Sequence, residues 1–173
     1  MMKILTTQIG GLLQRIAANG EESIEETARL LAQATIGEGR VIIAGFGEMG
    51  AVTATALTSV EPFKGAIRYV EGMDIESADR VWLLSRSAED ERALSLAQML
   101  AERFIPFAAL SADKPAEENM LEDLSYTYVS TGLTRGLLPG ENGERIVQPH
   151  AIAALFVYEA VKLAYDEMIS DED

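Results

Sequence analysis

The sequence predicts an α/β fold of three layers, in which a five-stranded parallel sheet lies between two layers of helices. From residue 40 onwards, short apolar stretches alternate with helical patterns, an order typical of strand–helix–strand units. The strand candidates are apolar at nearly every position, which indicates strands that are buried on both faces. The 173 residues are enough for a full core, and we expect one domain over residues 1–173.

Residues 1–36 are expected to form two helices ahead of the first strand. In the first helix, apolar residues recur at helical spacing, and Asn19-Gly20 has the composition of a helix end. Ser23 and Glu26 then have the spacing of a capping box, which predicts a second helix that runs to about Thr35. Two helices would thus precede the sheet.

The sheet itself is expected within residues 40–129. Strands are predicted at 40–45, 66–70, 80–84, 106–110 and 125–129, and helices at about 48–59, 88–103 and 116–122. Residues 130–148 are predicted to form a long polar loop, and loops of that length are often functional. The last helix, at 149–169, is apolar on most faces, so either a second copy of the chain or the N-terminal helices must cover it. We expect a homodimer.

The composition excludes several classes of function. Fourteen basic residues against twenty-eight acidic residues give a net charge of −14, which disfavours nucleic acid and anionic membranes as partners. No apolar stretch approaches the roughly 20 residues that span a bilayer. The chain has no cysteine, which rules out disulfides and fits the cytoplasm, where we expect the protein to reside. In so acidic a chain, a phosphate site must be built locally from backbone and hydroxyl donors.

The most informative segment is the glycine-rich turn after the first strand. Gly45, Gly47 and Gly50 separate an apolar strand from a helix of small residues, so free backbone N–H groups gather at a helix N-terminus and favour an anion. Two ligand classes fit this turn. One is a sugar phosphate, and the other is a dinucleotide such as NAD, whose ribose Glu71 would bind after the next strand. Alternatively, the glycines serve only the tight turn.

A second loop, after the strand at 80–84, carries two hydroxyl side chains, Ser85 and Ser87. An amphipathic helix follows, and the next strand leads to Ser111. This order resembles the sugar isomerase (SIS) domain, in which one strand ends in Ser-x-Ser-Gly-x-Thr and the next strand ends in a serine or threonine. The turn at Gly45 is similar to that family's Gly-x-Gly-x-Ser loop.

The resemblance covers most of the chain and is strongest to uncharacterised bacterial SIS-like and phosphoheptose isomerase-like proteins. The segment Arg145-Ile146, ahead of the last helix, is similar to an Arg-Ile-Gln segment of the phosphoheptose isomerase branch. The resemblance implies a flavodoxin-like sandwich that binds a phosphorylated sugar, either as an aldose–ketose isomerase or without catalysis. From the two loops and the long polar loop, we expect these ligand-binding residues: Gly45, Gly47, Ser85, Arg86, Ser87, Asp90, Ser111, Thr131 and Arg135.

The sequence departs from the SIS pattern in both loops. Met49 stands where the first loop has a serine, and Ala88 stands where the second loop has a glycine. Asp90 stands where a threonine or serine would donate a hydrogen bond to phosphate. A carboxylate there repels a phosphate unless a cation intervenes, and Arg86 is the cation nearest in sequence. Alternatively, Asp90 and the serines cap the helix that follows.

The candidates for catalysis are Glu48, in the glycine turn, and His150, at the start of the last helix. Isomerisation needs a base that moves a proton between neighbouring carbons. A helix N-terminus lowers the pKa of a histidine and so favours its neutral, base-competent form. Alternatively, His150 only packs against or caps that helix. With one histidine and no cysteine, we expect no metal site, and we expect no cofactor unless the NAD alternative holds.

Overall fold

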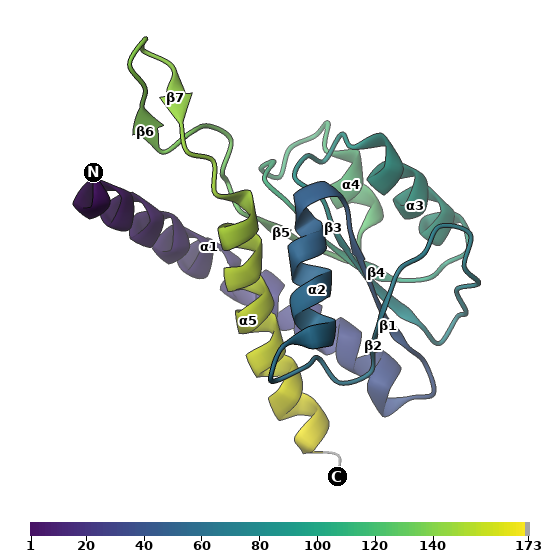
Figure 1. Cartoon of the computed structure of the whole chain (residues 1–173). Coiled ribbons are helices and arrows are strands. Elements are labelled where there is room, and N and C mark those ends of the chain that lie inside the picture. Colours follow the sequence, from purple (N-terminus) through teal and green to yellow (C-terminus); the bar gives the residue numbers. More distant parts are fainter. Residues whose placement is uncertain (172–173) are drawn as a thin grey trace.

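A parallel sheet of five strands forms the middle layer of the molecule, which the computed structural model describes over residues 1–171 (Figure 1). The strands lie in the order β2-β1-β3-β4-β5. Their bounds are Val41–Gly45 for β1, Ala66–Arg68 for β2, Arg80–Leu84 for β3, Phe107–Ser111 for β4 and Thr127–Ser130 for β5. In register, Ile42 of β1 pairs with Ile67 of β2 on one side and with Val81 of β3 on the other. The predicted fold class is confirmed.

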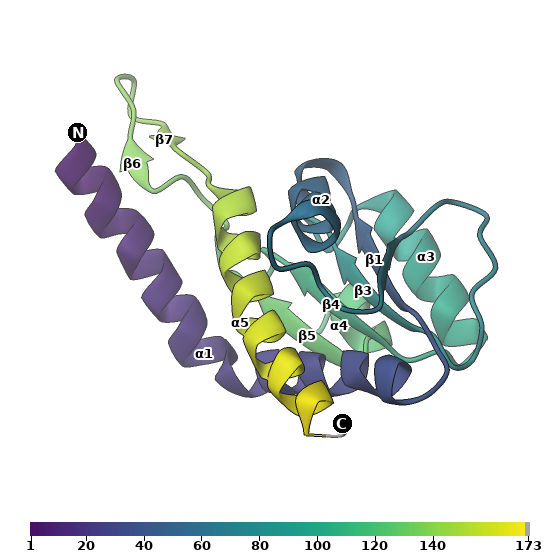
Figure 2. The same ribbon diagram turned by 60° about the horizontal axis from the view of Figure 1, so that its bottom comes forward.

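Helices cover both faces of the sheet (Figures 1 and 2). Their bounds are Met2–Ile36 for α1, Gly50–Thr58 for α2, Glu91–Glu102 for α3, Met120–Leu124 for α4 and His150–Ser170 for α5. Successive strand residues point to opposite faces, so the sheet contributes to two cores. Val41 and Ile43 belong to the core under α1, α2 and α5, whereas Ile42 and Ala44 belong to the core under α3 and α4.

The chain begins with one continuous helix, so the prediction of two helices in residues 1–36 is wrong in this respect. Figure 2 shows that the axis of α1 bends partway along, but the helix is not interrupted. Gly20 is buried within α1 and packs near Val129 of β5 instead of ending the helix. Ser23 does not open a second helix, because its carbonyl accepts hydrogen bonds from the hydroxyls of Thr27 (2.7 Å) and Thr127 (3.3 Å).

The segment 130–148, predicted to be a loop, contains a short antiparallel hairpin. Its strands are β6 (Leu138–Pro139) and β7 (Arg145–Ile146). The hairpin lies beside the N-terminal end of α1 and leads into α5 (Figures 1 and 2). Two helices also begin later than predicted, α3 at residue 91 instead of 88 and α4 at residue 120 instead of 116.

An aromatic cluster joins α5 to the sheet. Trp82 of β3, the only tryptophan in the chain, stacks with Tyr158 of α5 at 6.2 Å between ring centroids. Phe63 lies 6.4 Å from Trp82 and stacks on Tyr165 at 4.1 Å. All four side chains are buried. Aromatic contacts of this kind add to the free energy gained from burial, so the cluster stabilises the attachment of α5.

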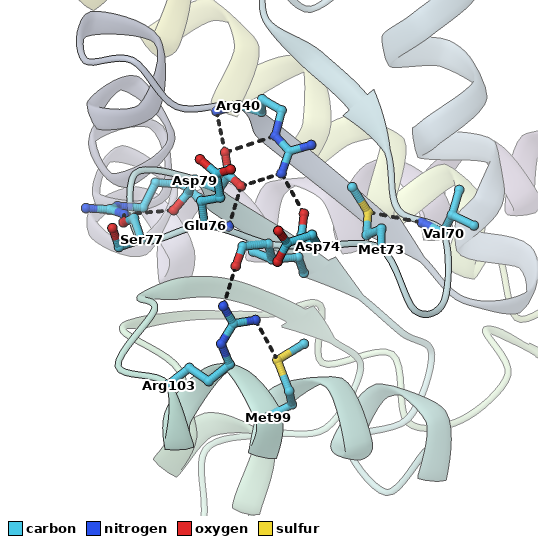
Figure 3. Close-up of polar contacts among 11 residues, drawn as sticks. Arg40, Val70, Met73, Asp74, Glu76, Ser77, Asp79, Met99 and Arg103 are labelled. Carbon is cyan, nitrogen blue, oxygen red and sulfur yellow. Dashed lines mark hydrogen bonds and ion pairs between the residues drawn. The ribbon is translucent and has the colours of Figure 1, made fainter.

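At the opposite edge of the sheet from the loops that end β1 and β3, Arg40 and Asp79 form an ion pair (Figure 3). The buried Asp79 carboxylate accepts hydrogen bonds from the backbone N–H groups of Arg40 and Glu76, both at 2.8 Å, and from the Arg40 guanidinium at 2.6 and 3.1 Å. Burial alone would raise the pKa of Asp79, but these hydrogen bonds outweigh it and lower that pKa. Arg40 also donates to the Asp74 carbonyl (2.7 Å), so the pair fastens residues 74–79 to the start of β1.

Candidate functional site

The strand order places a topological switch point between β1 and β3. The chain moves from β1 to β2 on one side and then returns to β3 on the other side of β1. In open parallel sheets, ligands bind beyond the carboxyl ends of the strands at such a point. The loops that meet there are the glycine turn (45–50) and the serine loop (85–90), and the Arg86 guanidinium lies 3.5 Å from the Glu48 carboxylate. The structure thus brings the two predicted loops together.

The glycine turn has a geometry that only glycine permits at two positions. A Cβ atom on Gly45 would lie 2.4 Å from the Met49 carbonyl oxygen and 2.8 Å from the hydroxyl of Thr53. Gly47 has a φ of +59°, in the left-handed region that other residues seldom adopt. The turn continues through a short 3₁₀ turn, Gly47–Met49, directly into α2. Both glycines are therefore required by the backbone, whatever ligand binds beside them.

The serine loop is held by its own hydrogen bonds. The buried Ser85 hydroxyl donates to the carbonyl of Ser87 (2.8 Å), and the Ala88 N–H donates to the Asp113 carboxylate (2.6 Å). The Ser87 hydroxyl oxygen accepts the N–H of Glu89 (3.1 Å), which leaves the hydroxyl hydrogen of Ser87 available to a ligand. Ser85 is therefore a structural member of the loop, whereas Ser87 can also donate.

Asp90 is the N-cap of α3. Its carboxylate accepts the N–H of Ala93 at 2.9 Å, which satisfies one of the free donors at the helix start. The same side chain lines a hollow of about 450 Å³ between the two loops, which we call the switch-point hollow. Its lining consists of Phe46, Gly47, Glu48, Arg86, Ser87, Glu89 and Asp90. Three of these residues are acidic and one is basic, so an anionic ligand depends on Arg86, Ser87 and the positive end of α3.

His150 is the first residue of α5 and is buried, with its Nε2 atom 3.3 Å from the side-chain oxygen of Gln148. Burial lowers the pKa of His150, the charge of Glu48 opposes this effect, and the charge of Arg86 adds to it. The net shift is downward, so the imidazole is neutral at neutral pH. Glu48, Arg86 and His150 are thus close enough to act on one another's charge.

The remaining predicted ligand residues lie elsewhere. Ser111 is buried after β4, where its hydroxyl bonds to the Tyr128 hydroxyl and accepts the N–H of Asp113 (3.3 Å). Thr131 is buried after β5, and its hydroxyl oxygen accepts the N–H of Leu133 at 3.3 Å. Arg135 lies in a different hollow, beside α1. Among the described residues that line the switch-point hollow, none of these three is found.

Glu71 lines a second hollow, of about 390 Å³, on the β2 side of the glycine turn. The rings of Phe46 and Tyr69 lie 6.1 Å apart there, and the Arg92 guanidinium lies 5.4 Å from the Phe46 centroid. Sequence reasoning missed Phe46, Tyr69 and Arg92. Arg92 could have been found from its place in the first turn of α3, directly after the serine loop, and Phe46 from its place between the two glycines.

Two further features bear on the class of protein. Over residues 1–171, no three His, Asp or Glu side chains gather closely enough to hold a metal ion. In the same part of the chain, no helix has the length and apolar character that crossing a membrane requires.

The strand order, with the glycine turn and the serine loop at the switch point, defines a domain of the sugar isomerase (SIS) type and confirms the predicted superfamily at the level of the fold. NanR of Vibrio vulnificus, solved in complex with ManNAc-6P, is 18% identical with a TM-score of 0.73 over 99% of this chain, which spans only 64% of that chain. The hypothetical protein MJ1247 of Methanococcus jannaschii, whose structure infers a 3-hexulose-6-phosphate isomerase function, is 14% identical with a TM-score of 0.65, over 99% of this chain and 96% of that chain. Protein c3406 of E. coli CFT073, solved in complex with arabinose 5-phosphate, is 19% identical with a TM-score of 0.59, over 95% and 93% of the two chains.

The chain belongs to the family described as a domain of unknown function, DUF2529, whose model matches residues 1–169. YwjG of Bacillus subtilis (strain 168), described as an uncharacterized protein, is 30% identical over 174 residues, which cover 99% of this chain and 99% of that protein. This member of the DUF2529 family therefore has an SIS-type fold.

Proposed function

We propose that this chain binds a phosphorylated sugar in the switch-point hollow. The observation that carries the proposal is the meeting of the two loops at the switch point, where Ser87 has a hydroxyl hydrogen to donate and Arg86 supplies a guanidinium. The complexes of NanR with ManNAc-6P and of c3406 with arabinose 5-phosphate, proteins of the same fold, support this ligand class. In the proposed complex, Arg86 and Ser87 bind the phosphate, and Glu48 accepts hydrogen bonds from sugar hydroxyls.

The experiment is a calorimetric titration of the protein with arabinose 5-phosphate, N-acetylmannosamine 6-phosphate and sedoheptulose 7-phosphate. The matching unphosphorylated sugars serve as ligand controls. We expect at least one phosphorylated sugar to bind, and Ser87→Ala to weaken it by about tenfold through loss of a charge-assisted hydrogen bond. Ser77→Ala, at the opposite edge of the sheet, is the matched control. If the sugar binds equally well without its phosphate, the proposal is wrong.

The finer proposal is that the bound sugar is isomerised between its aldose and ketose forms. The base must take a proton from the carbon next to the carbonyl and return it to the neighbouring carbon. Glu48, which lines the hollow, is placed to do this, and the neutral His150 can exchange a proton with the sugar oxygens. In D₂O, an isomerase exchanges the transferred hydrogen with solvent, which NMR detects. We expect Glu48→Gln to abolish this exchange; a wild-type protein that binds sugar without exchange is instead a non-catalytic sugar binder.

The second candidate function is binding of NAD or another nucleotide without catalysis. The observation that favours it is the hollow at Phe46, Tyr69 and Glu71, which offers aromatic faces beside a carboxylate that can bind ribose hydroxyls. A thermal-shift comparison of NADH with sugar phosphates separates the two candidates. Stabilisation by NADH that is lost in Glu71→Gln would favour the nucleotide; stabilisation by sugar phosphates alone would favour the sugar.

We also propose that the chain forms a homodimer. Large apolar side chains remain exposed on two of the helices that cover one face of the sheet: Ile4 on α1, and Ile152 and Leu163 on α5. Leu163 is 76% exposed, although it lies on a helix that is otherwise largely apolar. Burial against a second copy would remove these side chains from water.

A further inference from the structure

A hollow of about 360 Å³ lies between the N-terminal half of α1 and the segment that precedes the β6–β7 hairpin. We call it the basic hollow, because Arg15, Lys114, Arg135 and Arg145 line it and none of its described lining residues is acidic. The whole chain has 14 basic residues against 28 acidic ones. Four basic side chains around one hollow therefore run against the charge of the rest of the molecule.

These four charges are not neutralised within residues 1–171. The ion pairs in that part of the chain involve other basic residues: Arg29, Arg40, Arg86 and Lys162. Arg145 donates to the carbonyl oxygens of Gly136 (3.0 Å) and Leu137 (2.8 Å), which fixes its guanidinium without cancelling its charge. Like charges gathered in this way repel one another, and a bound anion relieves that repulsion.

The wall of the basic hollow is rigid on the hairpin side. A Cβ atom on Gly136 would lie 2.4 Å from the carbonyl oxygen of Ile146, so the segment is pressed against β7. Leu12 and Leu133, which are both buried, also line the hollow. The arginines around it therefore start from a supported backbone, which lowers the entropy lost when a ligand binds.

The lining also limits the kind of anion. Thr134 and Gln8 add neutral hydrogen-bond donors, but no aromatic side chain is among the described residues that line the hollow, so they offer no face on which a nucleobase could stack. Three guanidinium groups can each bind a phosphate through two parallel hydrogen bonds. One phosphate group cannot use all of these donors together, whereas two linked phosphate groups can.

We infer that the basic hollow binds a compact polyanion that carries two phosphate groups and no nucleobase. The site is separate from the proposed sugar site, because the two hollows have no lining residue in common within residues 1–171. They are nevertheless neighbours: Lys114 of the basic hollow follows Asp113, whose carboxylate accepts the N–H of Ala88 in the serine loop. The two phosphate groups can be joined directly or through a sugar.

Calorimetric titration of the full chain with pyrophosphate and with fructose 1,6-bisphosphate, at low salt and without metal ions, tests the inference. We expect one of the two probes to bind at one site per chain, and orthophosphate to bind at least tenfold more weakly. The tighter probe shows whether the phosphates are joined directly or through a sugar. Arg135→Gln and Lys114→Gln should each weaken that probe by about tenfold. Arg29→Gln, which removes the same charge from an exposed position of α1, should leave the affinity unchanged.

Three results would overturn the inference. The first is no binding of either probe to the wild-type protein, and the second is an equal loss in Arg29→Gln, which indicates general screening of surface charge. The third is a change of molecular mass in Arg135→Gln by light scattering without any binding of the probes, which assigns the basic residues to contact with a second copy. Ser87→Ala, the variant that tests the sugar site, should leave the affinity for the probe unchanged, so failure at one site is distinguishable from failure at the other.

Discussion

At the scale of single residues, Asp90 has two roles that conflict. It caps α3 through Ala93, and it places a carboxylate in the hollow that we assign to a phosphate. Threonine can accept the same capping hydrogen bond but carries no charge. The two roles can therefore be separated by substitution.

We expect Asp90→Thr to tighten sugar-phosphate binding by about tenfold, because unit charges a few ångströms apart in a partly exposed site interact by roughly 1–4 kcal/mol. Its free energy of unfolding should change little, since the cap is retained. Asp90→Ala should lose about 1 kcal/mol of stability with the cap. Calorimetry and urea unfolding measure the two effects, and an unchanged affinity in Asp90→Thr would remove Asp90 from the phosphate site.

His150 makes the stability of the fold depend on pH. Its pKa is lowered in the folded chain, mainly by burial, from an ordinary value of 6.5. Between those two pKa values the unfolded chain binds more protons, so stability falls as the pH drops below 6.5 towards the folded pKa. We expect the wild-type Tm to fall more than that of His150→Gln between about pH 7.5 and about pH 5. Parallel Tm curves for the two proteins would contradict this assignment.

At the scale of the elements, Arg40 and Asp79 fasten the segment 74–79 to the start of β1 (Figure 3). We expect Asp79→Asn to cost about 2–3 kcal/mol, because buried donors lose a charged acceptor. The pKa of Asp79 is lowered, so its contribution is complete above 3.8 and is lost as the pH falls towards the folded pKa. The loss caused by Asp79→Asn should therefore shrink in strong acid. Asp74→Asn is the control, since Asp74 contributes only its carbonyl to Arg40.

The bend of α1 leads to a prediction about glycine. A Cβ atom on Gly20 would meet Ile24 at 3.6 Å and Val129 at 3.9 Å, which are ordinary contacts, and the position lies inside a helix. Gly20→Ala should therefore stabilise the protein by about 0.5–1 kcal/mol. Gly47→Ala should instead destabilise it by about 1 kcal/mol, because Gly47 has a φ of +59°. Urea unfolding of both variants decides, and a destabilised Gly20→Ala would mean that the bend requires glycine.

The elements that could be predicted from the sequence are those with a strong local pattern. The apolar strand at Val41–Gly45 and the turn after it are visible in the sequence, and they locate the switch point. The helix end expected at Asn19-Gly20 was wrong because tertiary packing on β5 and α5 overrides the weak local preference. The β6–β7 hairpin has strands of two residues each, too short for any alternation to be visible.

At the scale of the whole molecule, residues far apart in the chain decide the sites. Glu48, Arg86 and His150 could be predicted one by one, but only the fold shows that they act on one another. Arg135 was expected at the sugar site because it lies in the long loop, whereas the structure places it with Arg15 and Lys114. These residues come from separate elements, so no spacing in the sequence predicts the basic hollow.

The proposed homodimer gives a prediction at the same scale. We expect light scattering to give twice the chain mass for the wild type, and Ile152→Glu with Leu163→Glu to give a monomer, because two buried charges would oppose association. Val60→Glu, at a fully exposed apolar position outside α1 and α5, is the control and should leave the mass unchanged. A monomeric wild type would rule the homodimer out.

The position of Trp82 makes the protein its own optical probe. As the only tryptophan, it is the sole source of indole fluorescence, and its ring is fully buried between Phe63 and Tyr158. Within residues 1–171 its N–H has no hydrogen-bond partner, so the excited indole is shielded from water and should emit at short wavelength. Exposure of the sheet centre to water should shift the emission to the red. Because Trp82 and Tyr158 lie on β3 and α5, the same signal reports whether the helix that carries His150 remains attached to the strand that leads to Ser85.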